Sequence, residues 1–398
     1  MVEKFFVEGG AGEETFFQKR RFPRIIQNLY KYQFTKRRKA MDNELNTEKV
    51  ELLSLSCEEL VALMEKIGEP KYRAAQLFSQ LHKGISPDEM TNIGKKTREK
   101  LMAVASYHLP EVERKLVSKL DGTTKYLFSL SDKNCVESVV MRYKHGNTIC
   151  ISSQVGCLMG CAFCASTIGG KVRDLSPAEL LGQVIAAQKD MGERISNIVM
   201  MGIGEPLDNY NNVMKFLRLV GHEDGINIGY RHISLSTCGI VTGIDKLAKE
   251  NLPITLSISL HASDDKTRSE IMPINKKWNI DSLLGACKRY FAETGRRISF
   301  EYTLISGKND SPEAALALAK LLNSRLRTRT ETMPIHVNLI PVNPVKETGF
   351  KEPDRAAIGK FAAILEKNGI RATIRRTLGE DINASCGQLR RNASENKE

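Results

Sequence analysis

Three cysteines that stand close together in the sequence have the spacing of a metal-binding loop. Cys157, Cys161 and Cys164 form a C-x3-C-x2-C pattern, and no fourth cysteine or histidine stands near enough in the sequence to complete a tetrahedral site. A structural zinc site normally has four protein ligands, whereas an iron–sulfur cubane held by three thiolates leaves one iron free to bind another molecule. The pattern therefore predicts a 4Fe-4S cluster with an open iron, and this indicates an enzyme.

The composition fits a cytoplasmic globular protein that interacts with a polyanion. The 398 residues are 41% hydrophobic. No apolar run approaches the roughly 18 to 20 residues that span a bilayer, and no secretory signal pattern is present. Nine cysteines, an odd number in a chain without an export signal, argue against a disulfide framework. The net charge of +12 favours nucleic acid as a partner.

The first 40 residues carry half of that charge. They contain ten Lys or Arg and four Glu, and aromatic residues are interleaved with the basic ones between Phe17 and Ala40. One interpretation is an arm that becomes ordered on contact with RNA. The other, which we favour, is a solvated tail or a start codon assigned upstream of Met41.

Helical and strand patterns indicate the elements that must position the cysteines. Residues 52–109 have a helical pattern, with Ser56 and Glu59 at capping-box spacing. Two β-rich stretches follow, at Thr124–Leu130 and Val136–Tyr143. Beyond them, seven further strands are predicted at Thr148–Ser152, Asn197–Met201, His232–Ser236, Thr255–Leu260, Ile298–Leu304, His336–Ile340 and Ala372–Arg375.

Helical segments separate these seven strands. Two of them begin with a Ser-Pro pair, at Ser176 and Ser311, as helix N-termini often do. Strands that alternate with helices predict right-handed βαβ units and a parallel sheet. We therefore expect an α/β fold, namely a partial (β/α)6 TIM-like barrel with a small helical N-terminal accessory domain.

The expected division of the chain has five parts. They are a basic extension without fixed structure (1–45), a helical accessory domain that contacts RNA (46–110), a β-rich connector (111–146), the barrel with a C-terminal cysteine loop (147–390) and a tail (391–398).

Polar residues gather where the predicted barrel strands end. In TIM-like barrels the chemistry occurs at the C-terminal ends of the strands. Gly204 and Glu205 follow the second strand, where a glycine lets the backbone approach a ligand and a carboxylate can accept from an ammonium or a ribose hydroxyl. Each residue alone is more often structural, but their shared location favours a site for a polar cofactor. The other members are Ser236, Ser259, His261 and Asn338.

This constellation resembles the radical S-adenosylmethionine superfamily, in which the amino and carboxylate groups of the cofactor occupy the open iron. Four longer motifs are similar to those of the RlmN/Cfr family of RNA adenosine methyltransferases, and the similarity spans roughly residues 50 to 390. These motifs are Cys150–Cys157, Ser259–Ala262, His336–Pro341 and Gly379–Leu389. The resemblance implies a radical SAM barrel with a 4Fe-4S cluster and S-adenosylmethionine as cofactors.

The resemblance also implies roles for individual residues. Cys386 would carry the methyl group, Cys150 would resolve the intermediate, and Glu137 would accept a proton. The implied cluster ligands are Cys157, Cys161 and Cys164, and the implied S-adenosylmethionine contacts are Gly204, Glu205, Ser236, Ser259, Leu260, His261 and Asn338. The motif around Cys386 departs from the family at three positions, Leu378, Asn383 and Ser385.

In the chemistry that the resemblance implies, Cys386 takes a methyl group from one S-adenosylmethionine. A second one, bound to the open iron, is cleaved to a radical that removes hydrogen from this S-methyl group. The methylene radical then adds to C2 of adenine. Loss of the C2 proton and attack of Cys150 on the sulfur of Cys386 release the product and leave a disulfide that a reductant reopens.

The resemblance names the substrate as an adenosine in the peptidyl transferase region of 23S rRNA, and in some members also the adenosine 3′ of the tRNA anticodon. It implies a monomer that receives electrons from a flavodoxin-type reductase system and does not bind a membrane. Three alternatives stay open at this point. They are the branch of the family that methylates C8 and has alanine where this chain has Pro206, a non-catalytic RNA-binding protein with a zinc clip, and a redox adaptor that uses Cys150 and Cys386.

Overall fold

The computed structural model describes residues 49–327, 333–343 and 348–384. The chain divides into two compact units, of which the first comprises residues 1–50 and 103–105. The second unit holds the rest of the chain, including the large sheet and the helices that connect its strands. Among the described helices, none is both long and apolar enough to cross a bilayer.

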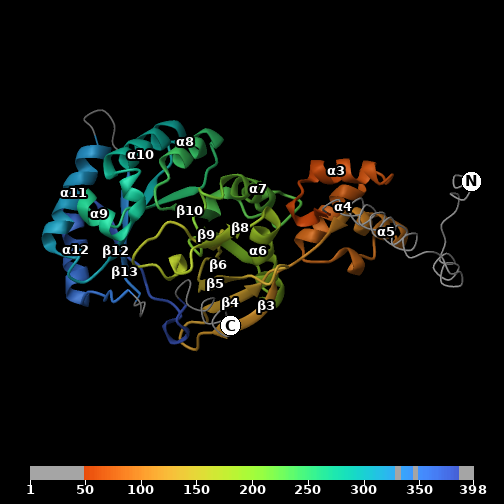
Figure 1. Ribbon diagram of the computed structural model, residues 1–398, viewed down its shortest axis with the longest axis horizontal. Helices are drawn as coiled ribbons and strands as arrows, with labels where there is room; N and C mark the ends of the chain where they lie inside the picture. Colours follow the sequence, from red (N-terminus) through yellow and green to blue (C-terminus); the bar gives the residue numbers. More distant parts are fainter. Residues whose placement is uncertain (1–48, 328–332, 344–347, 385–398) are drawn as a thin grey trace, which may run out of the picture. The chain divides into compact units, whose positions relative to one another are not determined.

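A sheet of ten strands forms the centre of the second unit (Figure 1). Seven strands are parallel, in the order of the sequence: β6 (Gly146–Cys150), β9 (Ile195–Met200), β10 (Ile233–Thr237), β11 (Thr255–Ser259), β12 (Ile298–Leu304), β13 (Ile335–Pro341) and β14 (Arg371–Ile374). Each predicted barrel strand is present, with its ends shifted by at most two residues.

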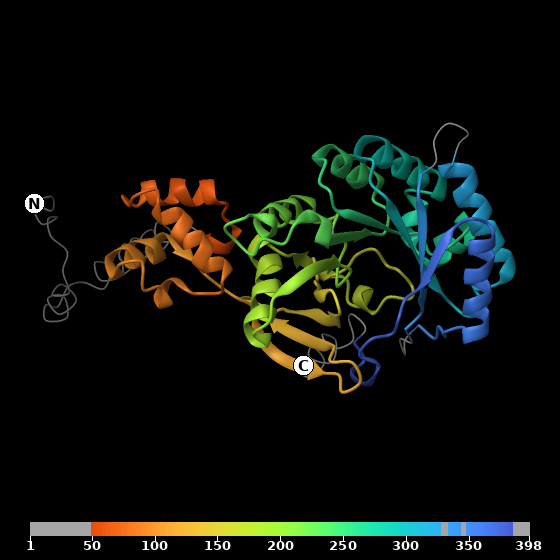
Figure 2. The ribbon, with the colours of Figure 1, turned by 180° about the vertical axis from the view of Figure 1, so that it is seen from behind.

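Helices connect each parallel strand to the next, so the predicted partial (β/α)6 barrel is confirmed. They are α6 (Pro177–Met191), α7 (Tyr210–Gly221), α8 (Val241–Glu250), α9 (Asp265–Ile271), α10 (Ile280–Thr294), α11 (Pro312–Leu326) and α12 (Arg355–Lys367). Figures 1 and 2 show the helices on the outer side of the curved sheet. The two edge strands of the sheet, β14 and β3, do not pair with each other, so the barrel stays open.

Three antiparallel strands extend the sheet beyond β6. They are β5 (Cys135–Tyr143), β4 (Thr124–Ser129) and β3 (Glu111–Val117). The sequence predicted β4 and β5 but not β3, because the residues of this edge strand are almost all exposed and lack an apolar pattern. The β-rich segment before the barrel therefore continues the barrel sheet.

Capping residues begin the helices as predicted. The hydroxyl of Ser176 accepts from the N–H of Glu179 (3.2 Å), and the Glu179 carboxylate accepts from the N–H of Ser176 (2.9 Å). The same capping box, at Ser56, starts α3 (Cys57–Lys66). With α4 (Arg73–His82) and α5 (Lys95–Val104), this helix forms the N-terminal helical segment.

Short elements complete the described chain. β7 (Gln154–Gly156) and β8 (Lys171–Asp174) form a two-stranded sheet, as do β1 (Val50–Glu51) and β2 (Ala105–Ser106). Single turns of 3-10 helix lie at Leu52–Ser54, Pro87–Glu89, Ala165–Thr167, Tyr230–His232, Pro273–Lys276 and Glu380–Ile382.

Candidate active site

The three cysteines of the metal-binding pattern lie in the loop between β7 and β8. Inside this loop the N–H of Cys164 donates to the carbonyl of Cys161 (3.0 Å). The N–H of Ala162 donates to the carbonyl of Ile271 at the end of α9 (2.9 Å). These bonds hold the loop against α9.

The surroundings of these thiols suit a metal cluster. Burial raises the pKa of Cys157 to about 11, with a contribution from the neighbouring Cys164. Burial and the other two thiols also raise the pKa of Cys161. Three thiolates can form so close together only beside positive charge, which a bound cluster supplies.

The spacing of these thiols also bears on the kind of metal site. In the described part of the chain, no three His, Cys, Asp or Glu side chains are gathered tightly enough to hold a single metal ion. A cubane binds each thiolate through a different iron, so it needs thiols that are near one another without converging on one point.

The glycines after β9 let two loops pack together. A Cβ at Gly204, where φ is 105°, would lie 2.6 Å from the Cβ of Gln154. A Cβ at Gly202 would lie 2.5 Å from the carbonyl oxygen of Ile151. The predicted close backbone approach is therefore made to the segment that leads into the cysteine loop. The N–H of Glu205 donates to Gln154 Oε1 (2.9 Å) and holds the two loops in register.

The buried carboxylate of Glu205 joins the loops after β9 and β10. One oxygen accepts from the N–H of Leu207 (3.0 Å) and the other from the N–H of Cys238 (2.7 Å). Burial raises the pKa of Glu205, and these two N–H donors oppose the rise. Since each carboxylate oxygen has a second lone pair, Glu205 can still accept from a ligand.

His261, after β11, is a neutral side chain with a defined tautomer. Its Nδ1 accepts from the N–H of Thr303 (2.9 Å), so the ring hydrogen is on Nε2. Burial and the nearby Arg268 lower the pKa of His261 to about 3. Its ring packs edge-on against Phe163 of the cysteine loop, with ring centroids 5.0 Å apart. His261 therefore contacts the loop and keeps an N–H to donate.

A buried carboxylate that the sequence analysis missed lies between two predicted cofactor contacts. Glu301 on β12 is in register with Ser259 on one side and Asn338 on the other. Asn338 donates to Glu301 Oε2 (2.7 Å), and burial raises the pKa of Glu301. A single acidic residue in the otherwise uncharged strand β12 was the signal for it.

The predicted cofactor contacts thus lie on neighbouring elements of the sheet. They come from the loop after β9 (Gly204 and Glu205), from β10 (Ser236), from the end of β11 (Ser259, Leu260 and His261) and from β13 (Asn338).

A buried arginine, which the sequence analysis also missed, contacts the backbone at the ends of β10 and β11. Arg268 of α9 is 0% exposed. Its guanidinium donates to the carbonyls of Leu260 (3.1 Å), Cys238 (2.8 Å) and Ser259 (3.2 Å), and also to Asn275 Oδ1 (2.9 Å). No ion pair joins it to another described residue. Arg268 therefore fixes the ends of β10 and β11 through backbone carbonyls.

A second group of predicted residues shares one face of the antiparallel strands. Val139 on β5 lies opposite Cys150 on β6, and Glu137 lies two residues before Val139. Since alternate residues of a strand point to the same side, Glu137 and Cys150 share that face. They are 2% and 5% exposed. Two predicted catalytic residues, 13 positions apart in the sequence, thus lie on adjacent strands.

Lys125 on β4 lies on the same face, because Leu127, two residues on, is opposite Glu137. Its Nζ is 3.1 Å from Glu137 Oε2, and both side chains are 1% exposed. The same Nζ donates to the carbonyl of Asn383 (3.0 Å). Lys125 therefore connects Glu137 to the C-terminal segment.

The segment 378–384 is fastened over this face. The Asp381 carboxylate accepts from the Ser118 hydroxyl (2.7 Å) and from the N–H of Lys119 (2.9 Å). The N–H of Gly379 donates to Asp121 (2.9 Å). These bonds tie the segment to the turn between β3 and β4.

Two apolar residues of this segment cover the cluster formed by Cys150, Val139 and Met141. They are Leu378 and Ala384. Leu378 departs from the family pattern, and in this structure it provides apolar contact. Cys386 and Ser385 lie outside the described residues, and Cys386 follows Ala384 by two positions.

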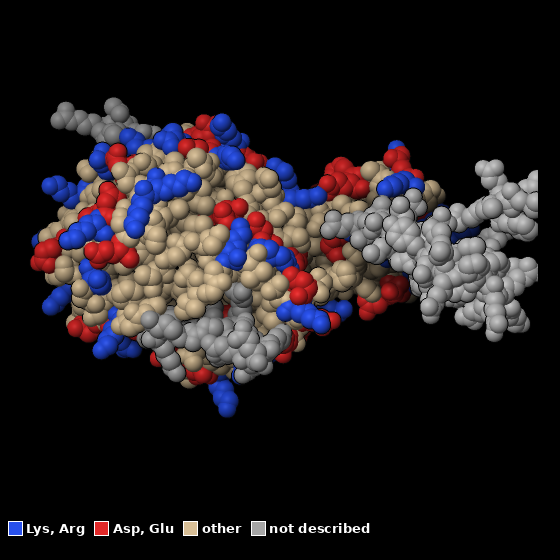
Figure 3. Space-filling view, viewed as in Figure 1, with Lys and Arg blue, Asp and Glu red and all other residues tan. Residues whose placement is uncertain are grey.

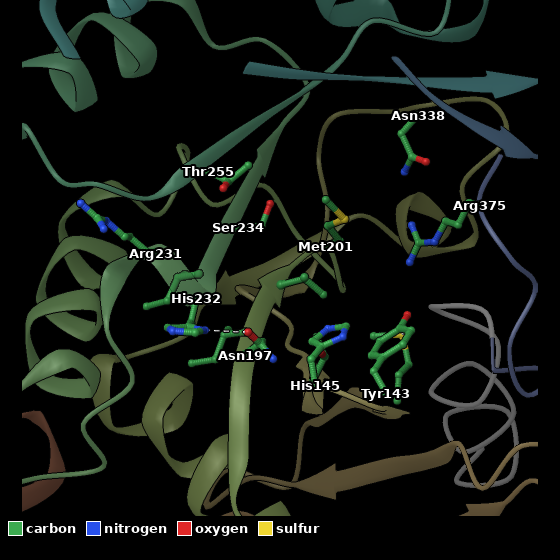
Figure 4. A pocket seen from close by; sticks show the side chains of 15 residues that line it. Tyr143, His145, Asn197, Met201, Arg231, His232, Ser234, Thr255, Asn338 and Arg375 are labelled. Carbon is green, nitrogen blue, oxygen red and sulfur yellow. Dashed lines mark hydrogen bonds between the residues drawn. The ribbon is translucent and has the colours of Figure 1, made fainter. Parts of the chain in front are cut away.

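A cavity of about 390 Å³ is lined mostly by residues near the starts of the parallel strands, among them Asn197, Ser234 and Thr255 (Figure 4). Met141 and Met201, which belong to or pack against the Cys150 cluster, line it together with Asn338 of the predicted cofactor contacts. Tyr143 and Arg375 also face it. Of the predicted site residues, only Asn338 lines the cavity, whereas Met141 and Met201 connect it to the cluster around Cys150.

Sequence and structure comparisons identify the family. A profile of the radical SAM superfamily matches residues 151–319, and one of the ribosomal RNA large subunit methyltransferase N-terminal domain matches residues 50–106. A Clostridium acetobutylicum protein named "Probable dual-specificity RNA methyltransferase RlmN" is 53% identical over 341 residues, which are 85% of this chain and 96% of that protein. The chain belongs to the RlmN family of radical SAM RNA methyltransferases.

Other comparisons agree with this family. A protein of the same name from Alkaliphilus oremlandii is 49% identical over 88% of this chain and its own full length. The crystal structure of a radical SAM methyltransferase from Sphaerobacter thermophilus is 40% identical, has a TM-score of 0.80, and is matched over 85% of this chain and 98% of that one. The protein is therefore a methyltransferase that acts on RNA and uses a 4Fe-4S cluster and S-adenosylmethionine. The zinc-clip and redox-adaptor alternatives are wrong.

Proposed function

We propose that this enzyme methylates C2 of an adenosine in the peptidyl transferase region of 23S rRNA through a methylated cysteine, Cys386. One observation carries the proposal: Cys150, Glu137 and the segment that leads to Cys386 lie together on one face of the sheet. Consecutive Cα atoms are about 3.8 Å apart, so the Cα of Cys386 is within about 7.6 Å of that of Ala384. The chain thus allows Cys386 and Cys150 to meet.

Each proposed catalytic residue has a separate task. Cys386 receives the methyl group, and Cys150 attacks the sulfur of Cys386 to release the product, leaving a disulfide. Glu137 accepts the C2 proton of adenine. The disulfide between Cys150 and Cys386 is opened again by cellular reductant before the next cycle.

The cofactor site is assigned to the loops at the ends of the parallel strands. When bound, the cluster and S-adenosylmethionine supply the methyl group and the radical chemistry. Cys157, Cys161 and Cys164 would hold the cluster, and the Nε2–H of His261 would be free to donate to the cofactor. Gly204, Glu205, Ser236, Ser259, Leu260 and Asn338 would orient the rest of it.

We propose that the target base enters the cavity lined by Asn338, Met141 and Met201. It adjoins Asn338 on the cofactor side and Met141 and Met201 on the Cys150 side. A base that enters it must leave its stack in the RNA, at a cost of a few kcal/mol. Tyr143 and Arg375 face the same cavity and are suited to contact the base or its phosphate.

We propose further that tRNA is a second substrate, because the matched relatives are named as dual-specificity enzymes. On the face shown in Figure 3, basic and acidic side chains alternate over the described surface. Lysines of the accessory segment, such as Lys95 and Lys96, would contact RNA phosphates. We also propose a cytoplasmic monomer that a flavodoxin-type system reduces.

The decisive experiment is methylation of two RNA fragments, one from the peptidyl transferase region and one with the tRNA anticodon stem-loop. After anaerobic reconstitution, mass spectrometry should place the new methyl group on C2 of adenine in both. The Cys386→Ala enzyme should give no methylated RNA. Product from that variant would contradict the cysteine-carrier mechanism.

The same assay decides between the two branches of the family. The sequence Gly204-Glu205-Pro206 matches the C2 branch, whereas the C8 branch has alanine in place of Pro206. A methyl group on C8 would make the second candidate function, C8 methylation of the same adenosine, the correct one.

A further inference from the structure

Lys125, the buried lysine beside Glu137, takes no direct part in the proposed methyl transfer or proton transfer. Lys125 is among the largest fully buried side chains of the described residues. Burying an ammonium group is costly unless it is paired and hydrogen-bonded. Lys125 nevertheless lies on the face of the sheet that Glu137 and Cys150 share.

The contacts of Lys125 join the two parts of the proposed reaction. On one side its Nζ lies 3.1 Å from the carboxylate of Glu137, the proposed proton acceptor. On the other side it donates to the carbonyl of Asn383, three positions before the proposed methyl carrier Cys386. Asn383 has a φ of 46°, a left-handed conformation that asparagine adopts more readily than most residues.

The charge of Lys125 matters because Glu137 is fully enclosed. A buried carboxylate is stabilised when it is paired with a hydrogen-bonded cation, and the ammonium group of Lys125 is such a partner.

We infer that Lys125 is a positioning residue for the methylation reaction: its contacts with Glu137 and with the carbonyl of Asn383 fix the carboxylate of Glu137 relative to the cysteine segment. This inference rests on the proposed function. Without Lys125 the segment 378–384 is still held by Asp381, Gly379 and its apolar contacts. Methylation of Cys386 and attachment to RNA should therefore persist, while proton removal and release of the product should fail.

The test compares the covalent RNA–protein adduct with the released product. In Lys125→Gln, which keeps a hydrogen-bond donor but removes the charge, the adduct-to-product ratio should rise at least about tenfold, because a positioned general base contributes about 10²- to 10⁴-fold. Glu137→Gln should raise it as well. Lys125→Arg, which retains the charge, should restore a ratio near that of the wild-type enzyme.

Lys115→Met is the matched control. Lys115 lies on the neighbouring strand β3, opposite Tyr126, and pairs with Asp190. Tyr126 follows Lys125 directly on β4, so the two side chains point to opposite faces of the sheet. Lys115, which lies opposite Tyr126, is therefore on the face away from Lys125. Its loss should leave the ratio unchanged.

A second comparison separates the effect of losing the charge of Lys125 from the effect of losing its hydrogen bond to Asn383. Hydrogen exchange of residues 379–384 should become faster in Lys125→Gln than in Glu137→Gln, since the first variant alone weakens the bond to Asn383. If Lys125→Gln is too unstable to assay, the double variant Lys125→Gln/Glu137→Gln removes both charges together, and it should accumulate adduct as Glu137→Gln does.

Two results would overturn the inference. One is a Lys125→Gln enzyme with the wild-type ratio of adduct to product. The other is a Lys125→Gln enzyme that folds normally but has no methyl group on Cys386. Wild-type methylation and its loss in Cys386→Ala are measured in the same reactions, and they report separately on the proposed function.

Discussion

The cofactor side and the thiol side of the barrel each contain a fully buried cation, and the two cations are neutralised in different ways. Arg268 donates to backbone carbonyls at the ends of β10 and β11 and to an amide oxygen. Lys125 faces the carboxylate of Glu137. Carbonyl dipoles cannot take up a proton, whereas a carboxylate can. Arg268 is thus fixed by backbone groups, whereas Lys125 contacts the carboxylate that we propose as the proton acceptor.

The strongest test of this difference is the removal of the arginine. Arg268→Met should lower the free energy of unfolding by about 4 kcal/mol, because several buried carbonyls lose their donor at about 1–3 kcal/mol each. Chemical denaturation measures this loss. Arg268→Lys should recover only part of it, since an ammonium cannot reach all the carbonyls that the guanidinium contacts. Equal stability of Arg268→Met and wild type would show that the ends of β10 and β11 do not depend on this residue.

The lysine pair should behave differently in the same experiment. Lys125→Met alone removes the cation that pairs with the buried Glu137 carboxylate and should cost about 3–5 kcal/mol. The double variant Lys125→Met/Glu137→Gln should regain most of that stability, because no buried charge remains. A double-variant loss equal to the sum of the two single losses would mean that the pair does not act as a unit.

The dependence of the unfolding free energy on pH tests whether His261, one of the predicted cofactor contacts, is held neutral. The folded-state pKa of His261 is lowered to about 3, below its ordinary value, so the unfolded chain binds more protons between these two pKa values. Stability is complete above about pH 6.5 and should fall by about 1.4 kcal/mol per pH unit below it, or about 2 kcal/mol by pH 5. His82, also buried with its pKa lowered to about 3, adds a similar loss.

His261→Asn should abolish the part of the stability loss at low pH that comes from His261, and the part that comes from His82 should remain. Unfolding free energies of both proteins at pH 7 and pH 5 give the comparison. An unchanged pH dependence in His261→Asn would show that this histidine is not held neutral.

The smallest expected effect concerns Glu301, between Ser259 and Asn338. Glu301→Gln keeps the size of the side chain but removes the charge that accepts from Asn338. We expect weaker binding of S-adenosylmethionine by about tenfold, or about 1.4 kcal/mol, with little change in stability. Equilibrium binding to the reconstituted enzyme measures it. Unchanged affinity would limit Glu301 to a structural role.

The sequence was enough to predict the parallel strands and the capped helices, because periodic apolar residues and Ser-Pro starts are local signals. It was not enough for Lys125. A lysine in a strand is usually solvated, and its pairing with Glu137 depends on the register between β4 and β5. Arg268 escaped notice for a similar reason, since Asp264, Asp265 and Lys266 before it suggest an exposed helix.

The candidate site likewise combines a part with a local sequence signal and a part that depends on strand pairing. The three cysteines are close together in the sequence, and in the structure they lie in one loop. Glu301 joins the cofactor contacts only through strand neighbours, which no local pattern reveals. The predicted roles of individual residues, including that of Cys386, stay predictions that the experiments above test.

The unpaired edges of the sheet have a mechanical consequence. No ladder of hydrogen bonds joins β14 to β3, and the segment after β14 instead reaches the turn after β3 through Asp381 and Gly379. The chain between β14 and Gly379, together with these hydrogen bonds, therefore connects the two edges of the open sheet. Deleting one residue of it would either draw β14 and the turn between β3 and β4 closer together or break the bonds of Asp381 and Gly379.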